Sequence, residues 1–177
     1  MDPHRYFIAV TPRDTLDAAM ATGYVEVNHG KAAPLERMRD GDAVLFYSPR
    51  ESEGGKALQS FTALARIRGD ALYQARADGD SERPFRRPAD YLDVQPALIR
   101  PLIDALAFIR NKAHWGAPLR FGFVQVSRAD FACIAQAMGC DAASAFALPP
   151  IDGDAHAAFV ASQQRADGAA GIADAHR

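Results

Sequence analysis

Apolar and polar residues alternate along several runs of the chain, and a period of two is typical of β-strands with one buried face. The longest run, ALQSFTALARIRG at 57–69, is long for a single strand, so we expect it to bend or twist strongly, as barrel strands do. The segment 71–77 is its expected hairpin partner, and 84–93 is predicted to be extended although prolines interrupt it. Further strands are predicted at 5–10, 24–28, 43–48 and 120–127.

Helical spacing and helix-capping residues mark fewer segments. The clearest helix is predicted to begin after Ser127, a candidate N-cap, and to stop at Gly139. A shorter helix is expected to begin after Thr11, with Pro12 in its first turn, and to end at Gly23. One helical turn is predicted within 34–42, and a short helix at 98–106.

The order of these elements favours one α+β domain. Strands outnumber helices and do not alternate with them as β-α-β units, so we expect a mixed, curved sheet or small barrel with helices packed outside it. A chain of 177 residues is long enough for one such core. We place this domain at 1–146, and we predict that the alanine-rich segment 147–177 is a weakly ordered tail.

Charge and composition narrow the class of protein. A net charge of −2 at pH 7 argues against a protein that coats nucleic acid by bulk electrostatics, but it leaves room for a local basic patch. Cys133 and Cys140 have no metal-ligand spacing, so we expect two free thiols. The N-terminus lacks the character of a signal peptide, and no run approaches the roughly 18 apolar residues of a membrane span. We therefore expect a cytoplasmic protein that does not contact a membrane.

No recognised enzyme motif is present in the sequence. The chain has no Gly-rich phosphate loop, no G-x-S-x-G elbow and no H-E-x-x-H metal motif. His29 and His114 have no nearby acidic or cysteine partner in a recognised arrangement. The residues therefore specify no reaction, and we expect neither a metal nor a cofactor.

The segment 83–120 is basic although the chain as a whole is not. It contains seven Lys or Arg residues and three acidic ones, interleaved with aromatic rings. Its loop NKAHWG, at 111–116, includes Trp115, which is the only Trp of the chain. Cations for phosphates beside rings for base faces are typical of proteins that bind single-stranded or flipped bases. The open alternative is a solvated charged loop beside aromatic residues of the core.

Two further motifs, NHGK at 28–31 and YSPRE at 47–51, each lie where a predicted strand gives way to a loop. Such positions commonly line the mouth of a small barrel. Asn28 and Gln59 each offer a paired donor and acceptor for a base edge, and Gly30 lets a backbone approach a ligand closely. The alternative is that Gly30 serves a turn that Asn28 caps.

Taken together, these motifs resemble the EVE domain, a member of the PUA-like superfamily that includes the YTH and SRA modified-base readers. The resemblance extends over about 5–146 in the expected order. It rests on YFIAVTPRD, VNHGKAAPLERMRDGDAVLFYSP, LQSFTALARI, YQ at 73–74, PFRR at 84–87, IRPLIDALAFIRNKAHWGAPLRFGFVQVSRADF and the last helix.

The resemblance implies a PUA-like mixed β-barrel of about five to seven strands with flanking helices. It also implies a pocket for a base of RNA or DNA, often a modified one. The base-binding candidates are Asn28, His29, Gly30, Lys31, Tyr47, Ser48, Pro49, Gln59, His114 and Trp115. The phosphate-binding candidates are Arg86, Arg87, Arg110 and Lys112.

The leading hypothesis is therefore a non-catalytic reader whose partner is nucleic acid. An enzyme or small-molecule sensor would use the same pocket, with His29 or His114 as acid or base. A structural interaction protein is the third possibility.

Overall fold

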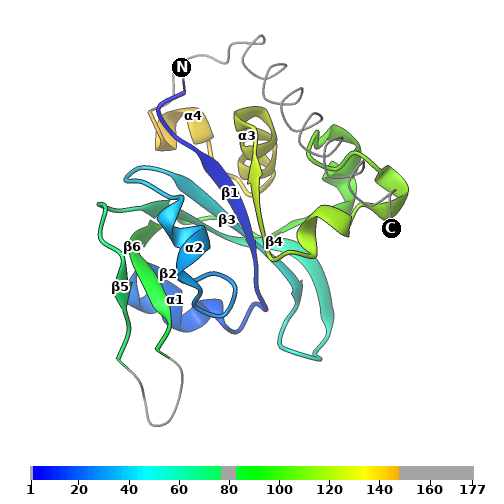
Figure 1. The fold of residues 1–177 in the computed structure, drawn as a ribbon. Helices are drawn as coiled ribbons and strands as arrows, with labels where there is room; N and C mark the ends of the chain where they lie inside the picture. The colour runs from blue at the N-terminus through cyan, green and yellow to red at the C-terminus, as the bar shows by residue number, and fades with distance from the viewer. Residues whose placement is uncertain (1, 77–82, 148–177) are drawn as a thin grey trace, which may run out of the picture.

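The computed structural model describes residues 2–76 and 83–147, and its centre is a strongly curled mixed sheet (Figure 1). The strands follow the order β2-β6-β4-β3-β1-β8, with β5 paired to β6 and β7 paired to β4. Strands β1 and β3 are parallel, and the other pairs are antiparallel. The strand bounds are β1 Tyr6–Val10, β2 Tyr24–Val25, β3 Ala43–Arg50, β4 Ala57–Ile67, β5 Tyr73–Gln74, β6 Phe85–Tyr91, β7 Ala97–Leu98 and β8 Phe123–Val126.

Short helices flank the sheet. The α-helices are α1 Leu16–Thr22, α2 Ala32–Glu36, α3 Arg128–Ala137 and α4 Ala142–Ala145. The segment between β7 and β8 contains three 3-10 turns, η1 Arg100–Ala105, η2 Lys112–His114 and η3 Ala117–Leu119. None of the helices in the described ranges is long and apolar enough to cross a membrane.

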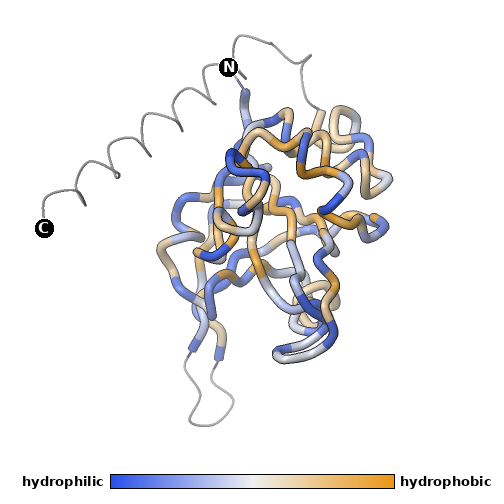
Figure 2. The backbone as a smooth tube through the Cα atoms, turned by 90° about the vertical axis from the view of Figure 1, so that its right-hand side faces the viewer, coloured by the Kyte–Doolittle hydropathy of each residue, from blue (hydrophilic) through white to orange (hydrophobic). Residues whose placement is uncertain are grey.

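Each face of the sheet buries its own apolar cluster, and β1 and the first part of β3 are hydrophobic on both faces for this reason. Figure 2 shows hydrophobic stretches of the chain in the interior of the fold. One face carries Ile8 and Leu45 and is covered by α3, α4 and the 3-10 segment. The other carries Phe7, Val44 and Phe46 and packs against α1 and α2. Adjacent residues of β3 therefore belong to different cores, because successive side chains of a strand point to opposite faces.

The predicted fold class is confirmed, with more strands than expected. The described residues form eight strands, and β2, β5 and β7 have only two residues each. Seven of the eight overlap segments that were predicted as strands, and the additional one is β7, whose two residues are too few to show an alternating pattern. The segment after the long strand also pairs with β6 rather than returning beside β4 as a hairpin, so that predicted pairing was wrong.

Two predicted helices begin or wind differently. Helix α1 starts at Leu16 rather than after Thr11, because the Thr11 N–H donates to the carbonyl of Tyr47 and so extends the sheet. The segment 98–106, which we predicted as one helix, contains the end of the two-residue strand β7. The 3-10 turn η1, which includes Pro101, follows it.

The last helix agrees closely with its prediction. Ser127 accepts a hydrogen bond from the Asp130 N–H, which caps the N-terminus of α3, and Gly139 adopts a φ of 76° just after its end. Cys133 and Cys140 are free, and burial raises the pKa of both thiols. The tail predicted at 147–177 lies outside the described residues from 148 onward.

Candidate functional site

A pocket of about 450 Å³ opens where β1 ends, and we call it the first pocket. Its walls come from the segment 10–19 after β1, from β2 and the turn that follows it, from β3 and β6, and from the loop 119–122 before β8. It is lined by Val10, Thr11, Pro12, Thr15, Leu16, Ala19, Tyr24, Glu26, Asn28, His29, Phe46, Arg86, Tyr91, Leu119, Arg120, Phe121 and Gly122. Its volume lies in the range of small-ligand sites.

The turn after β2 is held in a left-handed conformation that few side chains tolerate. Asn28, His29 and Gly30 have consecutive φ values of 49°, 57° and 79°. Asn and His are among the non-glycine residues that adopt this region most readily. A Cβ at Gly30 would lie 2.3 Å from the Cβ of Pro84, so this glycine serves the close packing of the turn. The turn therefore places Asn28 and His29 in the pocket wall and leaves Gly30 behind it.

A hydrogen bond connects this turn to the opposite wall. The Asn28 Nδ2 donates to the carbonyl of Phe121 at 3.3 Å. Gly122 gives the amide its space, because a Cβ there would lie 2.1 Å from the Asn28 Oδ1. The ring of Phe121 is 81% exposed beside the pocket, which is unusual for so large an apolar side chain. Asn28 keeps one N–H and its carbonyl oxygen for further partners.

An arginine forms another part of the wall. The Arg86 Nε donates to the Glu26 carboxylate at 2.9 Å, and its guanidinium lies 3.9 Å from the centroid of the Tyr24 ring. The Tyr91 hydroxyl donates to the Tyr24 carbonyl at 2.9 Å. Burial raises the pKa of both tyrosines, so they stay un-ionised near neutral pH. The first pocket thus combines aromatic faces with a fixed cation, a carboxylate and an amide.

A second pocket of about 440 Å³ lies beside the first and shares Val10, Leu119 and Arg120 with it. Its walls come from the ends of β3 and β4 and from the 3-10 segment. It is lined by Val10, Tyr47, Pro49, Arg50, Ala57, Gln59, Trp115, Gly116, Leu119 and Arg120. The sequence-predicted base-binding residues are therefore divided between two adjoining pockets rather than gathered in one.

Several predicted site residues line neither pocket. Ser48 is fully buried and its hydroxyl pairs with Thr62 at 2.7 Å. Lys31, His114 and Arg110 are exposed. The Lys112 ammonium donates to the carbonyls of Ile103 and Leu106, both at 2.9 Å, and so closes the end of the η1 turn.

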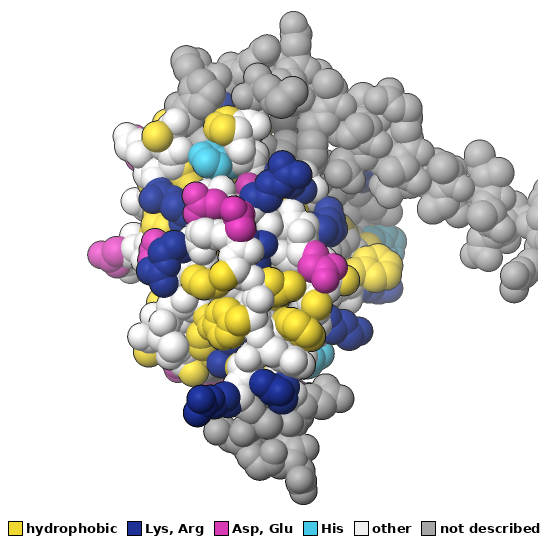
Figure 3. Space-filling model, turned by 60° about the vertical axis from the view of Figure 1, so that its left-hand side comes forward, with side chains coloured by type: hydrophobic (Ala, Val, Ile, Leu, Met, Phe, Trp, Pro, Cys, Tyr) yellow, Lys and Arg dark blue, Asp and Glu magenta, His cyan; other side chains and the backbone are white. Residues whose placement is uncertain are grey.

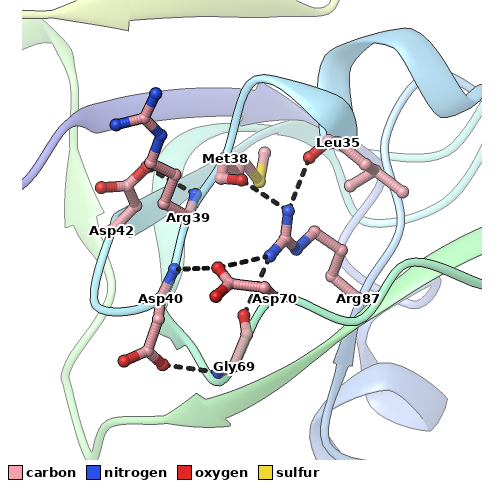
Figure 4. Close-up of polar contacts among 8 residues, drawn as sticks. All are labelled: Leu35, Met38, Arg39, Asp40, Asp42, Gly69, Asp70 and Arg87. Atoms are coloured by element: carbon pink, nitrogen blue, oxygen red, sulfur yellow. Dashed lines mark hydrogen bonds and ion pairs between the residues drawn. The ribbon is translucent and has the colours of Figure 1, made fainter.

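Arg87 lies inside the fold, not at its surface (Figure 4). Its guanidinium donates to the carbonyls of Leu35, Met38 and Gly69, and its side chain is 5% exposed. It therefore connects the end of α2 to the turn after β4. We leave Arg87 out of the phosphate-binding candidates, because its terminal N–H groups donate to three carbonyls and its side chain is buried, so that a phosphate has no access to it.

Most residues of the first pocket were not among the predicted site residues, although Tyr91 and Arg120 lie in the segment 83–120 that was recognised as basic and aromatic. The larger or polar ones come from the β1–α1 connection, β2, β3, β6 and the 119–122 loop, and they include Thr11, Glu26, Phe46, Tyr91, Arg120 and Phe121. One signal that the sequence offered was an aromatic residue between an arginine and a glycine, in RFGF at 120–123. The structure shows that this aromatic residue, Phe121, is exposed. The aromatic residues of the strands look like core residues until the curl of the sheet is known.

Basic side chains are dispersed over the surface. On the face shown in Figure 3, Lys and Arg side chains lie among acidic and hydrophobic ones and form no single basic field. Within residues 2–76 and 83–147, no group of three His, Cys, Asp or Glu residues could hold a metal ion.

A curled mixed sheet with short flanking helices, and with a polar and aromatic pocket at the end of β1, defines a PUA-like domain. Comparison with known proteins agrees with the resemblance seen in the motifs. The chain belongs to the EVE domain family, whose pattern it matches over residues 5–137.

A relative and two solved structures show how far the similarity extends. The UPF0310 protein msl3206 of Mesorhizobium japonicum is 41% identical over 137 residues, which cover 76% of this chain and 91% of that protein. The crystal structure of protein Atu2648 from Agrobacterium tumefaciens has a TM-score of 0.50 at 15% identity and covers 78% of this chain and 95% of its own. The NMR structure of Rpa0253 from Rhodopseudomonas palustris has a TM-score of 0.50 at 16% identity, with 76% and 93% covered. These structures share the fold.

Proposed function

We propose that the first pocket binds a base, modified or unmodified, that RNA or DNA presents outside its stack, and that the protein reads this base without reacting with it. The observation that supports this best is the composition of the pocket. Aromatic rings, on which a base can stack, stand beside a fixed set of donors and acceptors that can pair with its edge.

Three side chains would contact the base edge. Asn28 offers a donor and an acceptor on one amide, and its left-handed backbone and its bond to Phe121 hold it in place. Arg86 offers further donors, and Glu26 offers acceptors. Their ion pair fixes both groups before a ligand arrives, which lowers the cost of ordering them on binding. This assignment moves Arg86 from a phosphate contact to a base contact.

Arg120 would contact the backbone of the nucleic acid, because it is exposed at the boundary of the two pockets. Lys31, Arg110 and Lys112 are also exposed but line neither pocket, and the Lys112 ammonium donates to two backbone carbonyls. Few phosphates are contacted in this arrangement, because Arg120 is the only one of these four cations that lines a pocket. We therefore expect modest affinity and a shallow dependence on salt, with a slope of about −0.7 per phosphate contact to a single strand.

The acid–base alternative has less support. His114 lies outside both pockets. Of the two histidines that this alternative names as acid or base, only His29 lies in a pocket wall. No described observation favours a chemical step over binding.

Titration with nucleosides and short oligonucleotides tests the proposal. Mixed-sequence RNA and DNA, with unmodified and methylated bases, are titrated by calorimetry at two salt concentrations. Asn28→Gly keeps the left-handed turn but removes the amide, and it should weaken nucleoside binding about tenfold. Lys56→Ala, at an exposed residue outside both pockets, is the matched control and should bind like the wild type.

The outcomes separate the alternatives. Absence of binding of all these ligands at millimolar concentration would overturn the proposal. Binding of nucleosides that Asn28→Gly does not weaken would move the site elsewhere on the protein. Conversion of a bound nucleoside to a product that is lost in His29→Ala would favour the enzyme.

A further inference from the structure

The second pocket has a ring and an amide in its wall, and the proposed function does not use them. It lies at the same end of the sheet as the first pocket but on the other face. Phe46 lines the first pocket and its neighbour Tyr47 lines the second, because adjacent strand residues point to opposite faces. The two pockets meet over Val10, Leu119 and Arg120 and so form one continuous path around the end of β1.

A strained residue sits in the wall of the second pocket. Gln59 has a φ of 46°, a left-handed conformation that costs free energy for a non-glycine residue. It lies where the pairing of β3 and β4 shifts between Ser48 and Arg50, so that β4 contains an extra residue. Bulges of this kind redirect a side chain beside a functional site. The Ile99 N–H donates to the Gln59 carbonyl at 3.0 Å, which holds the bulged backbone in place.

The side chain of Gln59 is fixed by an arginine that also contacts Trp115. The Arg100 Nε donates to the Gln59 Oε1 at 3.1 Å, and the Arg100 guanidinium lies 5.7 Å from the centroid of the Trp115 ring. With its oxygen bound, the amide of Gln59 has its NH2 group available to a ligand, since that group donates to none of the described residues. Trp115 is half-buried and packs against the core with part of its ring.

The boundary between the pockets is marked by a cation. Arg120 is exposed and lines both pockets. Its guanidinium makes no hydrogen bond or ion pair within the described part of the chain. Two bases that occupy adjoining pockets are joined by a phosphate that must pass close to this boundary. A free cation at that place suits the phosphate, as rings and an amide suit a base.

We propose that the second pocket binds the nucleotide next to the one whose base enters the first pocket. Trp115 stacks on its base, Gln59 donates to the base edge, and Arg120 contacts the phosphate between the two nucleotides. This inference rests on the proposed function of the first pocket. It assigns the protein a ligand of at least two linked nucleotides in place of a free nucleoside.

A comparison of dinucleotides with nucleosides tests the inference. Mixed-sequence dinucleotides and the matching nucleosides, in ribo and deoxyribo forms, are titrated against the full chain. Because Trp115 is the only Trp, its fluorescence reports on the second pocket directly. We expect dinucleotides to bind at least tenfold more tightly than nucleosides and to quench this fluorescence, whereas nucleosides leave it unchanged.

Variants of each pocket show how much that pocket contributes to the binding of dinucleotides and of nucleosides. Trp115→Leu and Gln59→Gly, which suits the left-handed backbone, should each weaken dinucleotide binding about tenfold and leave nucleoside binding unchanged. Arg120→Gln should reduce the slope of the salt dependence by about 0.7 for the dinucleotide. Asn28→Gly should weaken both ligands, and Lys56→Ala should weaken neither.

The failure of each proposal looks different. Equal binding of nucleosides and dinucleotides, with no effect of Gln59→Gly and no quenching of Trp115, overturns the second pocket and leaves the first intact. Absence of binding of both ligands overturns both proposals. If Trp115→Leu does not fold, Gln59→Gly and the fluorescence of the wild-type protein still decide the question.

Discussion

Replacing Arg87 tests whether this buried basic residue stabilises the fold or binds a phosphate. Replacing it with Met keeps most of the aliphatic volume and removes the guanidinium, which donates to three backbone carbonyls. At about 1.5 kcal/mol for each hydrogen bond of a charged donor, Arg87→Met should cost about 4 to 5 kcal/mol of folding free energy. The ion pair with Asp70 adds little, because its atoms are 3.8 Å apart and that carboxylate is 84% exposed.

A loss of this size is a large fraction of the 5 to 15 kcal/mol that stabilises a typical domain. Urea unfolding, followed by circular dichroism and by the fluorescence of Trp115, measures it directly. Arg87→Lys should lose about half as much, because one ammonium cannot reach all three carbonyls at once.

Arg86→Met is the matched control one residue away. Its ion pair with Glu26 is partly exposed, so we expect a loss of about 1 kcal/mol in stability together with weaker base binding. The structural role of Arg87 is refuted if Arg87→Met unfolds within about 1 kcal/mol of the wild type and loses affinity for oligonucleotides. That result would return Arg87 to the phosphate-binding residues.

Three further predictions concern the pocket, the core and pH. Gly122→Ala should weaken base binding and also cost stability, because its Cβ displaces the Asn28 amide and the backbone has a φ of 77°; calorimetry beside urea unfolding separates the two effects, and unchanged binding would contradict the role of that amide. Asp130→Ala should cost about 3 kcal/mol in urea unfolding, since the Asp130 carboxylate accepts from the N–H groups of Ala107 and Phe108 at 2.8 and 2.9 Å; a loss below 1 kcal/mol would refute this. Burial raises the pKa of Tyr47 to about 12, and unfolding returns it to about 10. Below pH 10 this group therefore gives no pH dependence, and between pH 10 and 12 stability should fall by about 2 to 3 kcal/mol as the unfolded chain ionises first. Tyr47→Phe should make that decline shallower by about this amount in thermal unfolding curves, while Tyr6, Tyr24 and Tyr91, whose pKa values burial also raises, account for the rest. An equally steep decline in Tyr47→Phe would assign the whole of it to other groups.

The sequence determined much of the fold through local signals. Alternation along 57–69 predicted a long bent strand, and the structure bends it with the bulge that contains Gln59. The capping hydroxyl of Ser127 and the glycine at 139 predicted α3 with the correct ends. Such features depend on neighbours within a few residues, so a linear pattern is enough to identify them.

The start of α1 depended on a distant strand, and the partner of β5 is the strand that follows it rather than the one before it. Thr11 and Pro12 have the composition of a helix N-terminus, yet pairing with β3 keeps Thr11 in the sheet. The two-residue strand β5 pairs with β6, the next strand along the chain, where we had expected a hairpin with β4. A tertiary hydrogen bond outweighed local preference at Thr11, whereas at β5 two residues were too short a pattern to choose between two neighbouring strands.

The tertiary structure also determined that the candidate site is divided between two pockets. The motifs at 28–31 and 47–51 both stand where a predicted strand ends, so the sequence analysis placed them around one pocket. The curl of the sheet instead directs Asn28 to one face and Tyr47 to the other. Arg86 and Arg87 also show that the sequence alone did not decide which basic residue belongs to the site. They are adjacent and chemically identical, and the period of two in β6 places one in a pocket wall and the other among buried carbonyls.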